Sequence, residues 1–126
     1  MNIILKYILL LIGGAIMSNK TKELVEFICT TDEFTNLKKA KKNIDKNKNL
    51  KKQVEDFKKR QLKMQKSKLS KEHLNSEMMR LNNDFKTLNE VPQVTEFFQS
   101  TKEFNTMMFN LFKEINVLLD SRLNSK

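Results

Sequence analysis

Two stripes with heptad spacing flank a short polar turn near the middle of this 126-residue chain, and they constrain its fold more than any other feature. Residues separated by alternating steps of four and three lie on one face of an α-helix, and apolar ones form the seam of a coiled coil. The turn, residues 66–70, is too short to carry the second helix anywhere except back along the first. The sequence therefore predicts a long central antiparallel helical hairpin over residues 50–88. Its predicted seam is Leu50, Val54, Phe57, Gln61 and Met64 on the first arm, and Leu74, Met78, Leu81, Phe85 and Leu88 on the second.

The composition favours helices throughout the chain. A sheet-rich domain needs frequent turns, which depend on Gly, Pro and Asn, but this chain has only two Gly and one Pro. Nine Phe and seven Met, with no Trp, predict a core of Phe, Leu and Met that packs adaptably. We predict an all-α fold of about five helices. They cover approximately residues 20–29, 30–45, 48–68, 70–89 and 92–122.

Residues that favour the start of a helix mark the boundaries between these predicted helices. Thr30 and Glu33 have the spacing of a capping box, and Ser70 is placed to cap the second hairpin arm. Pro92 disfavours a helical conformation at the residue before it and suits the first turn of a new helix. The sequence therefore predicts a corner at Pro92.

The helix after Pro92 is the most apolar in the chain. Its length and apolar surface exceed what a soluble monomer usually leaves uncovered, so we expect a dimer or a larger oligomer. The face that we predict to be buried in the core or in the oligomer contains Phe97, Phe104, Met108, Leu111 and Ile115.

The net charge of +9 is concentrated in one region. Residues 38–68 contain 14 basic and three acidic residues, a local net charge of +11. Such a field attracts an acidic protein, an anionic lipid or nucleic acid. Phe57 is the only aromatic residue among the lysines of the hairpin arm, and it belongs to the seam, so nothing predicts base stacking. The candidate basic partner surface is Lys38, Lys39, Lys41, Lys42, Lys51, Lys52, Lys58, Lys59 and Arg60.

No set of residues predicts catalysis or a metal site. His73 is the single histidine and has no nucleophile spaced to work with it. Cys29 is the single cysteine, which excludes an internal disulfide. We interpret it as a small buried residue on the inner face of the first helix; the alternative is one ligand of a cluster shared between chains. A reducing, cytoplasmic setting is the simplest interpretation.

Residues 1–16 are apolar and unlike the rest of the chain. The run from Tyr7 to Met17 is too short to span a bilayer. We predict that translation begins at Met17, since two GGA codons at Gly13 and Gly14 would resemble a ribosome-binding site. The alternatives are a signal peptide or a membrane anchor within residues 3–17. N-terminal mass analysis of the native protein tests this, and a product starting at Met1 would contradict it.

From Thr21 to Leu123 the sequence resembles the YlbF/YmcA family of small bacterial helical regulators. The order and spacing of several segments carry the resemblance. The first are Glu23-Leu24 and Asp32-Glu33-Phe34 with Leu37, Ala40 and Ile44. Leu50, Val54, Phe57 and Gln61 of the first hairpin arm follow, and the last segment is Leu88-Asn89-Glu90-Val91-Pro92-Gln93-Val94-Thr95-Glu96-Phe97-Phe98.

The resemblance implies an all-helical fold and no enzymatic activity. We predict a single helical domain over residues 17–126 that has no small-molecule substrate and, because Cys29 is the single cysteine, no cofactor. It implies oligomerisation with copies of itself or with related family members. It also implies an influence on RNA maturation by the endoribonuclease RNase Y, and through it on biofilm formation, competence or sporulation. Some relatives hold an iron–sulfur cluster through cysteines, whereas this chain has Cys29 alone. The alternative is a nucleic-acid-binding module that uses the surface between Lys38 and Lys68.

Overall fold

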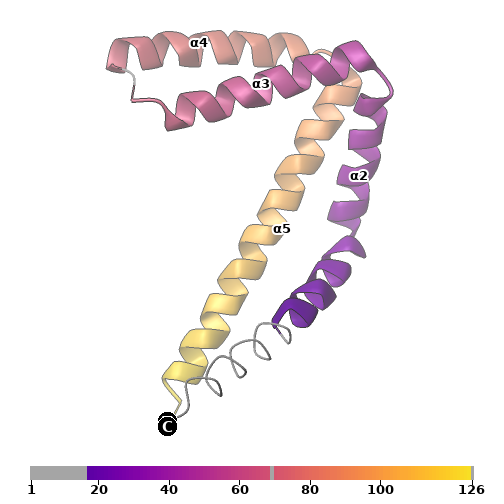
Figure 1. Cartoon of the computed structure of the whole chain (residues 1–126), viewed down its shortest axis with the longest axis vertical. Coiled ribbons are helices and arrows are strands. Elements are labelled where there is room, and N and C mark those ends of the chain that lie inside the picture. Colours follow the sequence, from indigo (N-terminus) through magenta and orange to yellow (C-terminus); the bar gives the residue numbers. More distant parts are fainter. Residues whose placement is uncertain (1–16, 69, 126) are drawn as a thin grey trace, which may run out of the picture. The chain divides into compact units, whose positions relative to one another are not determined.

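The computed structural model describes residues 17–68 and 70–125, and all the regular secondary structure in these ranges is helical. Residues 17–29 form a helix, and four more follow: α2 (Asp32–Asp45), α3 (Lys48–Lys66), α4 (Lys71–Leu88) and α5 (Pro92–Leu123) (Figure 1). The predicted all-α fold, with its hairpin and long last helix, is therefore confirmed. The predictions about residues 1–16 lie outside the described residues.

The chain divides into two compact units, Met1–Thr35 and Asn36–Lys126. In the described part of the first unit, the helix of residues 17–29 ends where the hydroxyls of Thr30 and Thr31 donate to the carbonyls of Phe27 and Ile28, each at 2.6 Å. Thr31 then caps α2, because its Oγ1 accepts a hydrogen bond from the Phe34 backbone N–H at 3.3 Å. The predicted Thr30–Glu33 capping box is therefore wrong by one residue.

The prediction that Cys29 is buried is also wrong, since its side chain is exposed. Ile28 is the residue of this helix that is buried, whereas Phe27 is 65% exposed. Successive residues of a helix point about 100° apart, so the residue after Ile28 is turned away from the buried side.

The core of the second unit is formed where α2, α3 and α5 meet. Small side chains allow helices to approach closely, and both Ala40 of α2 and Val94 of α5 have no exposed surface. The core cluster is Ala40, Ile44, Leu50, Val54, Val94 and Phe97. Among the residues that pack against its edge, only Leu88 comes from α4. Two members of the predicted hairpin seam, Leu50 and Val54, therefore contribute to a three-helix core.

The hairpin consists of α3 and α4, which lie side by side and antiparallel (Figure 1). Asn47 caps α3 through a hydrogen bond from the Leu50 backbone N–H at 3.1 Å, and Ser70 caps α4 as predicted. Phe57 and Leu81 are buried in the seam. Gln61, Met78 and Phe85, which we also predicted in the seam, are exposed, so the seam is only partly closed.

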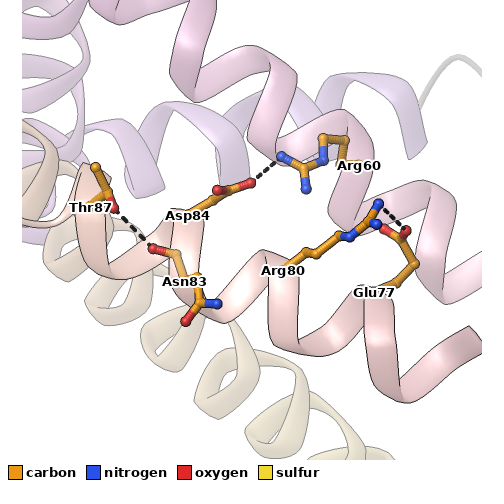
Figure 2. A network of polar contacts seen from close by, with 6 residues as sticks. All are labelled: Arg60, Glu77, Arg80, Asn83, Asp84 and Thr87. Carbon is orange, nitrogen blue, oxygen red and sulfur yellow. Dashed lines mark hydrogen bonds and ion pairs between the residues drawn. The ribbon is translucent and has the colours of Figure 1, made fainter. Parts of the chain in front are cut away.

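Polar contacts support the hairpin along its side (Figure 2). The guanidinium of Arg60 on α3 pairs with the carboxylate of Asp84 on α4, and this pair joins residues 24 positions apart. Within α4, Arg80 pairs with Glu77 at 3.6 Å and the Thr87 hydroxyl donates to the Asn83 carbonyl at 3.2 Å. Of these contacts, the Arg60–Asp84 pair is the one that joins the two arms. The side chains are substantially exposed, so such pairs add little to stability.

Helix α5 starts at Pro92, as predicted, with Val91 as its N-cap. Its 32 residues extend for about 48 Å at 1.5 Å per residue. Phe97 lies in the core, and the other four residues of the predicted face, Phe104, Met108, Leu111 and Ile115, are partly buried. Among the residues that the structure describes, no helix has the length and apolarity needed to cross a membrane.

Candidate functional site

A groove between the hairpin and α5 is a prominent surface feature of the second unit. It has a volume of about 1040 Å³ and is lined by side chains of α3, α4 and α5. We call it the elbow groove. Its apolar floor consists of Phe57, Met64, Met78, Leu81, Phe85, Phe98 and Phe109. Its amide side chains are Gln61, Asn82, Asn89, Gln99 and Asn105, and its charged side chains are Lys58 and Lys102.

Three phenyl rings in contact with one another line the elbow groove. The ring centroids of Phe85 and Phe98 are 5.3 Å apart, and Phe57 lies 5.9 Å from Phe98 in an edge-to-face arrangement. These distances are typical of favourable aromatic pairs. Because the three rings come from three different helices, they hold the hairpin against α5 and give the groove a firm apolar wall.

Lys58, one of the groove residues, contacts an aromatic ring of the core. Its Nζ lies 4.3 Å from the centroid of the Phe97 ring, within the range of a cation–π interaction. Partial burial, together with the nearby charge of Lys41, lowers the pKa of Lys58 below its ordinary value. Lys58, which we predicted as a member of the candidate basic partner surface, is therefore a partly buried residue of the groove wall.

The other members of the predicted basic surface lie on α2 and α3 and are exposed. Arg60 is engaged by Asp84, so seven lysines remain as a solvated surface. They are Lys38, Lys39, Lys41, Lys42, Lys51, Lys52 and Lys59. We call these seven the basic surface from here on.

The structure brings no catalytic or metal-binding group together in the part of the chain that it describes. His73 is exposed, and its Nδ1 lies 2.8 Å from the Oγ of Ser70, the cap residue of the same helix. No three His, Cys, Asp or Glu side chains of the described residues converge as ligands for a metal ion. The elbow groove offers apolar contact, amide hydrogen bonding and positive charge.

Sequence reasoning did not find the elbow groove. We predicted a single apolar face on α5, and the groove residues Phe98 and Phe109 lie beside that face. The available signal was a second heptad stripe on α5, which starts at Phe98 and continues through Lys102, Asn105 and Phe109. Its polar members hide it from a search for apolar periodicity, and only the packing of the hairpin against α5 shows what it lines.

Comparison with known protein families gives one result. A family model described as "Control of competence regulator ComK, YlbF/YmcA" matches residues 17–120, which is more than half of the chain. A search of curated proteins and a search of solved structures each found no match. The resemblance that the residues predicted is confirmed by the family model.

Proposed function

Because this chain belongs to the YlbF/YmcA family, which controls the competence regulator ComK, we propose that it is a cytoplasmic adaptor that regulates through protein contacts. The proposed target is an RNase Y-type endoribonuclease, whose processing of RNA the adaptor adjusts. The family relationship supports a regulatory role rather than an enzymatic one.

The basic surface is the observation that carries this proposal. Seven exposed lysines gather on two helices, α2 and α3, which meet at the core of the second unit. A surface of one charge sign raises the rate of encounter with a partner of the opposite sign and excludes partners of the same sign. The partner that fits is a protein with an acidic surface.

The same charge also suits RNA, which makes a nucleic-acid-binding module the second candidate function. The position of Phe57 favours the protein partner. It is the only aromatic residue between Lys38 and Lys68, and it is 7% exposed. Proteins that hold single-stranded RNA stack its bases on exposed aromatic rings, and the described residues offer none within this surface.

Neutralising part of the basic surface tests the proposal. We expect the triple variant Lys51→Gln, Lys52→Gln, Lys59→Gln to recover at least about tenfold less RNase Y from native cells than the unchanged chain, because each lost charge contact weakens the encounter and the complex. The measurement is co-precipitation quantified by mass spectrometry. The control removes the same charge elsewhere, through Lys71→Gln, Lys86→Gln, Lys113→Gln, and should recover normal amounts.

The RNA alternative is measured with the same proteins. Binding of a labelled single-stranded RNA that falls steeply between 50 mM and 200 mM salt, and that the Lys51, Lys52, Lys59 triple variant abolishes, would favour the nucleic-acid-binding module. If RNase Y is also not recovered with the unchanged chain, the adaptor proposal is wrong.

A further inference from the structure

The elbow groove has apolar surface to which the proposed function gives no role. Its walls are the hairpin on one side and α5 on the other, and both belong to the second unit. On α4, Phe85 is 38% exposed and Met78 is 45% exposed, and on α5 Phe109 is 67% exposed. The groove therefore offers apolar side chains that a partner can still cover.

The side chains of the groove suit an amphipathic helix. Such a helix places apolar anchors, separated by steps of three and four, into a hydrophobic groove of its partner. The rings of Phe57, Phe85 and Phe98 contact one another and form the firm part of this surface. Met64 and Met78 form the adaptable part, because the unbranched methionine side chain can repack around anchors of different shapes.

The dimensions of the groove favour a protein segment over a small molecule. Its volume of about 1040 Å³ lies at the upper end of the range of about 300–1,000 Å³ for small-molecule sites. Along α5 its lining runs from Thr95 to Phe109, about 21 Å at 1.5 Å per residue. A helix of about 14 residues has the same length.

The charge of the groove selects an acidic helix. The charged groups that line it are Lys58 and Lys102, with no carboxylate among the lining residues. Lys102 is exposed and can turn toward a partner, whereas Lys58 lies over the Phe97 ring and adds its charge from the wall. Two positive groups favour carboxylates on the partner and disfavour a basic helix.

We propose that the elbow groove binds an amphipathic helix of a different protein, one with large apolar anchors and with carboxylates beside them. The anchors pack on the phenylalanine and methionine side chains, and a carboxylate pairs with Lys102. The chain then has two docking surfaces with different chemistry. The basic surface attracts a partner by charge, and the groove holds a helix mainly by apolar contact.

The first test measures binding of a helical peptide to the full chain. The probe is a fluorescein-labelled peptide of about 15 residues, which as a helix matches the length of the groove along α5. It has leucine at alternating steps of three and four, glutamate beside the leucines and alanine elsewhere. We expect fluorescence anisotropy at physiological ionic strength, where distant charges are screened, to give a dissociation constant in the micromolar range.

Substitution of a groove methionine locates the peptide. We expect Met78→Asp to weaken binding by about tenfold or more, because it places a carboxylate among the apolar contacts and repels the acidic peptide. Met79→Asp is the matched control, since Met79 is the next residue of α4, is 67% exposed and lies outside the groove lining. It should bind the peptide normally. Both variants replace exposed residues, so circular dichroism should show unchanged helix content.

The second test exchanges charge across the proposed contact. We expect Lys102→Glu to weaken binding of the acidic peptide by about fivefold, and to strengthen binding of a peptide with lysine at every glutamate position by a similar factor. The control, Lys113→Glu, makes the same charge change at an exposed position of α5 outside the groove lining. It should leave both affinities unchanged. Equal effects of the two substitutions would contradict the pairing with Lys102 and overturn the proposal.

Other occupants of the groove give different results, and each of them overturns the proposal. A peptide with alanine in place of every leucine that binds as tightly would mean that charge alone holds it. If sedimentation velocity shows that saturating peptide converts an oligomer of the chain into monomers, the occupant is a second copy. If dodecanoate binds in a Met78-dependent manner and the peptide does not bind, the occupant is a fatty acid.

This inference goes beyond the proposed function and does not rest on it. The triple variant of Lys51, Lys52 and Lys59 should bind the peptide with normal affinity, although we expect it to recover less RNase Y. Loss of peptide binding in this variant would place the peptide on the basic surface and overturn the proposal, whatever the outcome for RNase Y.

Discussion

Replacing Phe97 by alanine is expected to lower the free energy of unfolding by about 3–5 kcal/mol. Phe97 is 6% exposed and belongs to the cluster in which α2, α3 and α5 meet. Its removal leaves a cavity beside Val94 and takes away the ring beneath the Lys58 ammonium. A small domain has about 5–15 kcal/mol of stability in total, so this loss would leave the variant close to unfolding.

Urea unfolding followed by circular dichroism measures this effect. The control is Leu118→Ala on the same helix, because Leu118 is 54% exposed, and we expect it to change the free energy of unfolding by less than about 1 kcal/mol. A loss below about 1 kcal/mol for Phe97→Ala would mean that the junction of these three helices is not the centre of the fold.

Replacing Leu81 by alanine is expected to lower the free energy of unfolding of the hairpin by about 2–5 kcal/mol. We expect this loss to be confined to the hairpin. Leu81 is 5% exposed and is the buried residue of α4. The main core depends on α2, α3 and α5. Loss of Leu81 should therefore detach α4 from α3, with the Arg60–Asp84 pair as weak compensation, while the core stays folded.

Hydrogen exchange resolved by segment checks this prediction. Amides of α4 should exchange faster by a factor of about 30 or more, as expected for a local loss of 2 kcal/mol or more, while amides around Val94 keep their protection. Met79→Ala on the same helix is the control, since Met79 is 67% exposed. Equal acceleration in α4 and α5 would show instead that the hairpin and the core unfold as one cooperative unit.

Local signals were sufficient to place the starts of α4 and α5. Helix α5 starts at Pro92 because proline fits the first helical turn, and Ser70 starts α4 because its hydroxyl accepts from the His73 backbone N–H. The one cap that was misplaced, at Thr30 instead of Thr31, shows the limit of such signals. Either threonine can cap a helix, and the choice depends on where the preceding helix ends.

Burial was harder to predict than secondary structure. Leu50 and Val54 have the spacing of a hairpin seam, and they are buried, but their neighbours are Ala40, Ile44 and Val94. Periodicity identifies the face of a helix that turns inward and does not identify the helix that covers it. Cys29 was placed on the wrong side of its helix for a related reason, because the residue after the buried Ile28 points about 100° away from it.

The elbow groove could not be derived from the sequence, because it exists only where three helices enclose a space. Phe57, Phe85 and Phe98 come from α3, α4 and α5, and their rings meet only after the chain has turned twice. Similarly, Lys58 looks like any other lysine in a run of charges, and its position over the Phe97 ring depends on how α3 packs against α5.

The sequence by itself determined the helical class, the cap at Ser70, the start of α5 at Pro92, the concentration of positive charge between Lys38 and Lys68, and the resemblance to the YlbF/YmcA family. These properties depend on residue type and spacing along the chain. The tertiary structure decided which helices share the core, which lysine is packed and which face of α5 stays open. Those outcomes depend on contacts between residues distant in sequence, for which helical periodicity carries no information.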